Sequence, residues 1–223
     1  MRTEVTKLDF TGQKIFAGID VHKSNWTLSL ETNDLALKTF QQPPEPQVLA
    51  RYLKKHYPNA DYLCGYESGF CGFWIQKELL SMGVNCVVVH SADVPTTHKE
   101  RIYKRDPLDS KKLARMLRTG DYNRLYIPDD HSLGDRNILR TRRMLVSDLT
   151  RYKNRIKALL CFWGIRYPDH FKKSTTHWSK RFIDWLQDLQ LNNPGSKTAL
   201  DTLIGQVNLF REAILKINSE IKS

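Results

Sequence analysis

The stretch AGIDVHKSNWTLSL, residues 17–30, decides the fold because it places a carboxylate inside an apolar strand. Asp20 follows a run of apolar residues, and a second segment rich in Trp and Leu begins a few residues later. Burying an acid in a strand is costly unless the carboxylate is paired or bound to a metal. The stretch therefore predicts two consecutive strands, the first of which carries a functional acid.

Short apolar segments surround this pair of strands and alternate with helical patterns. We expect strands at 14–22, 25–32, 35–42, 61–67 and 84–90, with helices at 47–58 and 72–83. This order predicts an α/β fold in which a mixed sheet is flanked by helices.

Residues 92–105 show no clear period, and we expect them to form a mobile loop. A helix should follow, with Asp106 as its N-cap, Pro107 at its first position and Gly120 past its end. From about residue 130 the pattern is helical with few breaks.

Apolar residues recur at spacings of three and four through 200–221, which is typical of a coiled coil or an antiparallel helix pair. This stripe predicts either a homo-oligomer formed through the C-terminal helices or packing on the body of the chain. We divide the chain into an α/β domain at 1–128, a basic helix at 129–165 that completes or leaves that domain, and a helical coiled-coil region at 166–223.

The net charge of +11 is distributed unevenly, and its distribution points to a polyanion partner. Residues 1–110 carry thirteen Lys/Arg and thirteen Asp/Glu, whereas 136–181 carry thirteen basic residues against two acids. The pattern favours nucleic acid, with a solvated basic helix as the alternative. The candidate phosphate-binding residues are Arg140, Arg142, Arg143, Arg151, Lys153, Arg155 and Lys157.

Four aromatic residues in or beside the same region either stack on bases or pack in a core. They are Trp163, Tyr167, Trp178 and Trp185. No apolar run approaches the roughly 20 residues that span a bilayer, and the polar N-terminus is unlike a signal peptide, so we expect a soluble intracellular protein with no membrane partner. The four cysteines show no metal-site spacing and are expected to be reduced and mostly buried.

Four acids lie near the ends of predicted elements in the first domain: Asp20, Glu67, Asp106 and Asp109. If the strands of Asp20 and Glu67 are neighbours, their side chains converge, and a helix docked on the sheet adds the other two acids, one turn apart. Crowded carboxylates repel one another until a divalent cation neutralises them, and oxygen ligands select Mg²⁺ or Mn²⁺. Two such ions roughly 4 Å apart support phosphodiester cleavage.

Three of these acids also have a purely structural interpretation. Asp106 can act only as a helix cap, and Asp109 as a first-turn acid favoured by the helix dipole. Glu67 can cap a helix that starts near Gly69. Asp20 has no such alternative, because a strand interior offers it none.

Other polar residues near these acids leave similar alternatives open. His22 shares a strand face with Asp20, so it either touches the site or lines the sheet edge. His90 is either a metal ligand or a structural residue, and Lys104 and Arg105 either hold phosphate near the metal or are loop charges.

Three motifs carry a family resemblance: GIDVHK (18–23), GYESGFCGFWI (65–75) and KRDPLDSKKLAR (104–115). In their order and spacing they resemble the N-terminal domain of the insertion-sequence one-ten family of transposases, also called DEDD transposases. The family's four acids would fall on Asp20, Glu67, Asp106 and Asp109.

The resemblance implies an RNase H-like (RuvC-like) mixed sheet flanked by helices and a divalent-metal site. It also implies DNA recombination at the ends and target of an insertion sequence, guided by a structured bridge RNA. Such a protein would act in the bacterial cytoplasm, associated with the nucleoid.

Two departures from the family stand out. Ser110 replaces an alanine, and nothing after residue 195 resembles the family's second domain, which supplies a serine nucleophile. We therefore expect a chain that does not complete transposition alone. Two other hypotheses stay open: a nucleic-acid-binding module whose acids are structural, and an actin-like kinase or ATPase lobe, whose Gly-rich turns are replaced here by VHKSNW.

Overall fold

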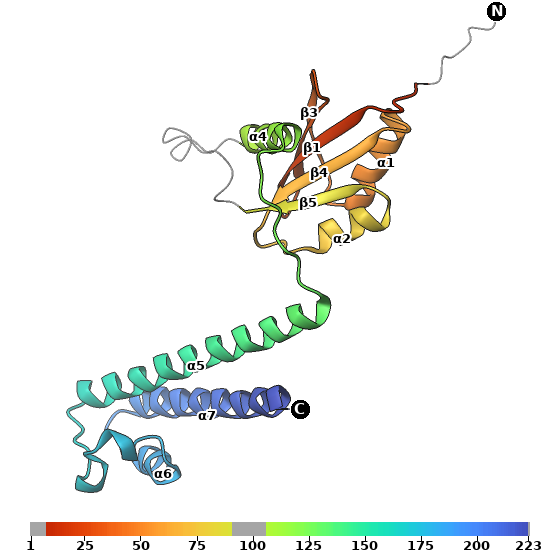
Figure 1. Cartoon of the computed structure of the whole chain (residues 1–223). Helices are drawn as coiled ribbons and strands as arrows, with labels where there is room; N and C mark the ends of the chain where they lie inside the picture. The colour runs from red at the N-terminus through yellow and green to blue at the C-terminus, as the bar shows by residue number, and fades with distance from the viewer. Residues whose placement is uncertain (1–7, 91–105, 223) are drawn as a thin grey trace, which may run out of the picture. The chain divides into compact units, whose positions relative to one another are not determined.

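The computed structural model of the chain describes residues 8–90 and 106–222. The chain divides into two compact units, Met1–Ile127 and Pro128–Ser223. In the first unit, five strands form one sheet in the order β3-β2-β1-β4-β5, as Figure 1 shows. The strands are β1 (Lys14–Val21), β2 (Trp26–Glu31), β3 (Ala36–Gln42), β4 (Asp61–Glu67) and β5 (Asn85–Val89).

The sheet is mixed. β1, β2 and β3 form an antiparallel meander, whereas β1, β4 and β5 run parallel. Together with the helices on its faces, this sheet confirms the predicted α/β class with an RNase H-like arrangement. The predicted order of strands and helices is also confirmed.

Helices cover both faces of the sheet (Figure 1). On one face, α1 (Pro46–His56) and α2 (Trp74–Ser81) pack their Leu49, Leu53 and Leu79 side chains against alternate residues of the strands. On the opposite face lies α4 (Asp106–Thr119), whose Leu113, Met116 and Leu117 form a smaller apolar cluster with the strands. β1, β2, β4 and β5 therefore present one side to the main core and the other to the face where α4 lies, whereas β3 is largely exposed.

The second unit is helical, which confirms the predicted helical extension. It consists of α5 (Asp130–Phe162), the short 3-10 helices η2 (Asp169–Phe171) and η3 (Ser174–Thr176), α6 (Lys180–Asp188) and α7 (Pro194–Lys222). At the start of α5, the Asp129 side chain accepts a hydrogen bond from the Ser132 backbone N–H at 2.7 Å, as an N-cap does.

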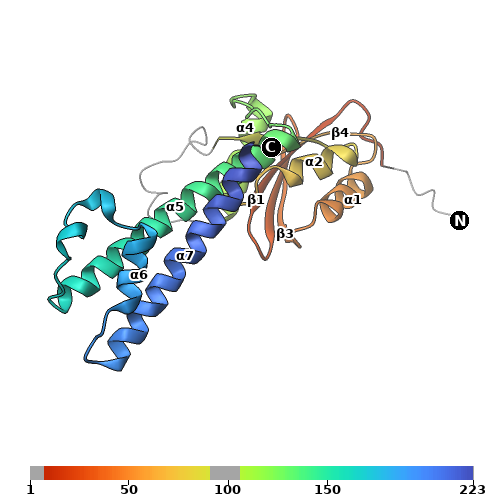
Figure 2. The same cartoon turned by 90° about the horizontal axis from the view of Figure 1, so that it is seen from below.

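α5 and α7 lie side by side and run antiparallel, as Figures 1 and 2 both show. The Arg142 guanidinium bonds the Asn218 side chain at 2.7 Å, and the rings of Tyr152 and Phe210 are 5.3 Å apart. One end of the pair is buried against α6 through an apolar cluster. The core residues there are Ile156, Leu160, Phe171, Phe182, Ile183, Leu186, Leu200, Ile204 and Val207. No described helix combines the length and the apolar character needed to cross a membrane.

Candidate functional site

The register between β1 and β4 places two of the predicted acids side by side. These parallel strands pair Ile19 with Tyr66, so the next residue along each strand is Asp20 and Glu67. Phe16 and Leu63 point to the α4 side of the sheet, and side chains alternate along a strand. Asp20 and Glu67 therefore lie on the α4 face, at the carboxyl ends of neighbouring strands.

α4 approaches this face closely because two glycines leave room for it. A Cβ atom at Gly18 would overlap the backbone carbonyl oxygen of Ser110 and the backbone nitrogen of Ala114. On β4, a Cβ atom at Gly65 would meet the Leu117 side chain at 2.8 Å. The two glycines thus bring the α4 backbone against β1, two residues before Asp20.

The direction of α4 places its first turn at the same end of the sheet as the acids. Ser110, near the start of α4, lies over Gly18, whereas Arg118, near its end, bonds the Glu31 carboxylate at 2.8 Å. Because Glu31 pairs with Phe16 of β1, the helix runs from the carboxyl end of β1 toward its amino end. The half-buried Asp109 precedes Ser110 and therefore lies toward Asp20.

A chain of buried hydroxyl groups fastens the start of α4 to the sheet. The Ser110 and Ser29 hydroxyl oxygens are 2.8 Å apart, and Ser29 is also 2.9 Å from the Thr39 hydroxyl. Ser110 and Ser29 are both buried. The Ser110 side chain therefore makes a specific contact with β2.

Asp20 is partly buried, with 19% of its side chain exposed. The His22 ring donates from Nε2 to the Asp20 carboxylate at 3.2 Å. This contact supports the interpretation in which His22 touches the site. The contact forms at the carboxyl end of β1, where the two side chains lie on the same face of the sheet.

One structural interpretation of an acid is wrong. α2 begins at Trp74 with Phe73 as its N-cap, so Glu67 does not cap that helix. Glu67 instead ends β4, where it pairs with Val89 of β5. His90 follows β5 and is exposed.

The predicted loop at 92–105, with Lys104 and Arg105, and the Asp106 side chain lie outside the described residues.

The described acids lie at one end of one face of the sheet, but they are not close enough together to form a complete metal site. Among described side chains, no three His, Cys, Asp or Glu residues lie close enough together to hold one metal ion. The donors that the fold brings to this end are carboxylate oxygens, which suit Mg²⁺ or Mn²⁺ rather than a thiolate-binding metal. The donor chemistry therefore fits a hard divalent cation.

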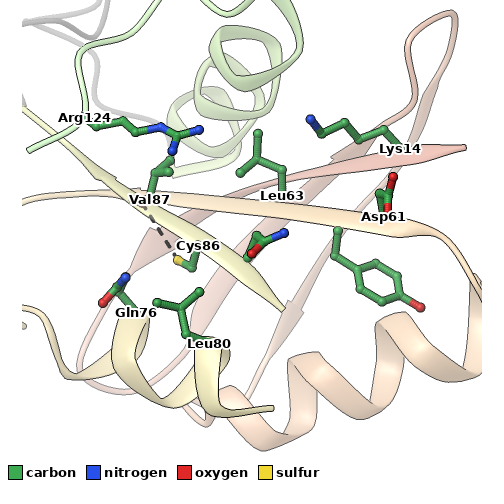
Figure 3. Close-up of a pocket in the computed structure, with 10 residues that line it drawn as sticks. Lys14, Asp61, Leu63, Gln76, Leu80, Cys86, Val87 and Arg124 are labelled. Carbon is green, nitrogen blue, oxygen red and sulfur yellow. Dashed lines mark hydrogen bonds between the residues drawn. The ribbon is translucent and has the colours of Figure 1, made fainter. Parts of the chain in front are cut away.

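A separate pocket lies at the opposite end of the sheet (Figure 3). Lys14, Asp61 and Asn85 line it, and each is the first residue of a parallel strand. Arg124 and Lys14 supply its positive charges, and Gln76 of α2 lies on its other side. Because Asp20 and Glu67 lie at the carboxyl ends of these strands, the pocket is not part of the acidic site.

The predicted phosphate-binding residues of α5 separate into two groups. Arg140, Arg143, Arg151 and Arg155 are exposed, whereas Arg142, Lys153 and Lys157 are half-buried. Arg136, which the sequence analysis does not single out, is also exposed. Its spacing of four and seven residues from Arg140 and Arg143 puts all three on one side of the helix.

Two residues of the half-buried group contact other parts of the second unit, namely α7 and the segment before α6. Arg142 bonds Asn218, and the Lys153 ammonium lies 5.3 Å from the centre of the Trp178 ring. Burial lowers the pKa of Lys153, and the positive charges of Arg211 and Lys157 lower it further. Arg211 of α7 thus joins a crowded positive cluster that a bound anion would relieve.

The aromatic residues near the basic region also separate. Tyr167, Trp178 and Trp185 pack against the apolar core of the second unit. Trp163, in contrast, is 46% exposed, and its ring meets that of Phe162, which is 78% exposed. Core packing therefore accounts for three of the four aromatics.

Comparison with known proteins identifies relatives. A family model for the DEDD transposase of IS110, described as a transposase, matches residues 17–163. The chain is 26% identical over 216 residues to "Transposase for insertion sequence element IS1533" from Leptospira borgpetersenii. The matched residues make up 94% of this chain and 60% of that protein.

A second relative is "Putative transposase y4qE" from Sinorhizobium fredii. It is 30% identical over 146 residues, which cover 66% of this chain and 36% of that protein. The chain thus spans less than two thirds of the length of either relative.

Proposed function

Because this chain belongs to the IS110 family of DEDD transposases, we propose that its first unit holds divalent cations and cuts and joins DNA strands of an insertion sequence. The ligands would be the carboxylates of Asp20, Glu67, Asp106 and Asp109, with Mg²⁺ or Mn²⁺ as the cation. The observation that carries the proposal is the β1–β4 register, which sets Asp20 beside Glu67 on the face where α4 begins.

When bound, the cation would supply Lewis-acid activation of the attacking oxygen and stabilisation of the leaving oxygen. The chain's own residues do the positioning. Asp20 and Glu67 are fixed by two paired strands, and Asp109 is fixed by the contact of α4 with Gly18. His22 holds the Asp20 carboxylate from its exposed side.

A Mn²⁺ titration with a matched set of variants tests this site. We expect Asp20→Asn, Glu67→Gln and Asp109→Asn each to weaken Mn²⁺ binding at least about tenfold, because each removes an anionic oxygen ligand. Asp61→Asn is the control, since Asp61 begins β4 at the far end of the sheet. Equal affinities for all four variants and the unmodified chain would contradict the proposal.

We further propose that α5 binds the DNA and a structured guide RNA through phosphates. Arg136, Arg140 and Arg143 form an exposed row on one side of the helix, and the cluster around Lys153 adds positive charge beside α7. Arginine contacts to phosphate are favourable because they release counterions, so the binding should weaken steeply with salt.

Filter binding of an RNA hairpin and of a DNA duplex over a range of salt concentrations tests the α5 surface. Arg140→Gln with Arg143→Gln should lower the salt-dependence slope by about 2, one for each phosphate contact. Arg51→Gln with Lys55→Gln removes the same charge from exposed positions on α1 and should leave the slope unchanged. A slope that falls equally in both double variants would show that only net charge matters.

Apolar side chains exposed on α5 and α7 support self-association as a further proposal. They are Leu139 at 53%, Met144 at 59%, Leu215 at 68% and Ile221 at 42% exposure. Leu139 and Ile221 also line one surface cavity. A second copy that covers this end would remove apolar area from water.

Sedimentation equilibrium tests the self-association. Leu139→Glu with Leu215→Glu should give a monomer at concentrations where the unmodified chain is a dimer or larger. Leu35→Glu, which charges a leucine 66% exposed in the first unit, is the control. A monomeric unmodified chain at high concentration would contradict this proposal.

The role in transposition would place the protein on the bacterial nucleoid, in the cytoplasm.

A further inference from the structure

Thr27 of β2 lies beside the acidic site. The β1–β2 register pairs Thr27 with Asp20. Its neighbours Trp26 and Leu28 point into the core beneath α1 and α2. Since side chains alternate along a strand, Thr27 points to the α4 face, as Asp20 does.

The Thr27 hydroxyl is buried without a hydrogen-bond partner in the described part of the chain. Only 2% of the residue is exposed. Ser29, two residues further on the same strand face, is equally buried but has Ser110 and Thr39 as partners. A buried hydroxyl that makes no hydrogen bond is unfavourable, so such a group needs an explanation.

The position of the Asp20 carboxylate supplies that explanation. His22, whose side chain is 44% exposed, holds Asp20 from the solvent side, whereas Thr27 lies opposite Asp20 on the buried side. Carboxylates that bind a metal are themselves held by hydrogen bonds, and these outer contacts affect metal affinity strongly.

We propose that Thr27 is a positioning residue of the cation site, whose hydroxyl donates a hydrogen bond to the Asp20 carboxylate when that carboxylate binds the cation. The inference rests on the proposed metal function. It adds a residue outside the four acids, on a strand that carries none of them. It also predicts opposite effects on two quantities: the hydroxyl should raise the affinity for the cation and lower the stability of the cation-free fold.

Thr27→Val tests the inference because valine has nearly the same shape but no hydroxyl. In the full chain we expect Mn²⁺ affinity to fall about tenfold, as for other residues that support metal ligands. We expect the cation-free chain to melt at the same temperature or higher, since a buried unpaired hydroxyl has been removed. Thr27→Ser keeps the hydroxyl and should retain Mn²⁺ affinity within about twofold, against the tenfold loss from removing the outer contact.

The same titration includes Asp20→Asn, which tests the metal site separately from the role of Thr27. One outcome is that the unmodified chain binds Mn²⁺, that Asp20→Asn abolishes this binding, and that Thr27→Val does not weaken it. In that case the metal site stands and the role of Thr27 is overturned. Loss of affinity in Thr27→Val together with a lower melting temperature also overturns it, because packing alone explains both. If the unmodified chain binds no Mn²⁺, the metal site and the role of Thr27 both fail.

Discussion

The two faces of the sheet in the first unit are built from different residues. Beneath α1 and α2 the strands present a nearly continuous apolar surface, which includes Ile15, Ile19, Leu28 and Tyr66. Beneath α4 the same strands present two glycines, a row of hydroxyl groups, and Asp20 and Glu67 at one end.

This difference separates the main hydrophobic core from the proposed cation site. The first face buries large side chains and supplies most of the hydrophobic stabilisation. The second uses small residues to bring a helix backbone close, and it tolerates partly buried acids and an unpaired hydroxyl. Mutations on the two faces should therefore affect different observables.

Leu79→Ala should have the largest effect on stability and little effect on the site. Leu79 of α2 is 0% exposed, so its truncation leaves a cavity and lowers the free energy of unfolding by about 2–5 kcal/mol. Mn²⁺ affinity per folded molecule should not change. Leu80→Ala is the control, because Leu80 is 44% exposed. Urea unfolding measures both variants, and equal destabilisation would contradict the assignment of the core.

Gly18→Ala should affect both stability and the site. The added Cβ meets backbone atoms of α4, which cannot rotate away, so we expect a loss of about 1–3 kcal/mol in the free energy of unfolding. Because α4 carries Asp109, Mn²⁺ affinity should fall as well. Gly69→Ala places a Cβ in open space and should leave both quantities unchanged. Normal Mn²⁺ affinity in Gly18→Ala would mean that α4 contact is not needed for the site.

Ser110→Ala should have a smaller effect that is confined to the α4 face. It removes one hydrogen bond to Ser29, which keeps its contact with Thr39, so the expected cost is about 0.5–1.5 kcal/mol. A double-mutant cycle with Ser29→Ala measures the coupling between the two hydroxyls. Strict additivity of the two single changes would show that the 2.8 Å contact contributes nothing.

Thiol reactivity should distinguish buried from exposed cysteines without any mutation. Cys64 and Cys86 are buried, whereas Cys161 is exposed. Burial raises the pKa of Cys64 from 9.0 to about 12, so Cys64 should react with iodoacetamide only after unfolding, while Cys161 reacts in the native protein. In the unfolded chain the Cys64 thiol ionises at a lower pH than in the folded chain. The contribution of Cys64 to stability is therefore present below about pH 9 and is lost as the pH rises toward 12. Labelling of Cys64 at the rate of Cys161 would contradict the assignment.

Local pattern was enough to predict most of the first unit. Alternating apolar residues and turn residues gave the order of strands and helices, and Asp20 was recognisable because an apolar strand gave it no structural role. The site depended on more than pattern. The partner of Ser110 is Ser29, which lies far away in sequence, and the close approach at Gly18 depends on a helix nearly a hundred residues later.

In the basic region, too, contacts between residues distant in sequence could not be predicted from the sequence pattern. Composition identified α5 as positively charged, but it could not separate the exposed Arg140 from Arg142, which bonds Asn218 of α7. Likewise, Trp185 packs in a core while Trp163 is exposed. Which side of a helix faces a partner is decided by tertiary packing, and a charge count contains no such information.

The most direct test of the central claim is the location of bound Mn²⁺ in the folded chain. Paramagnetic broadening of backbone amide signals reports which residues lie near the ion. We predict that the signals of Asp20, Glu67 and Asp109 broaden first, while those of Asp61 and Asn85, at the opposite end of the sheet, stay sharp. Broadening centred on Asp61 and Asn85, or spread evenly over the surface, would contradict a cation site on the α4 face.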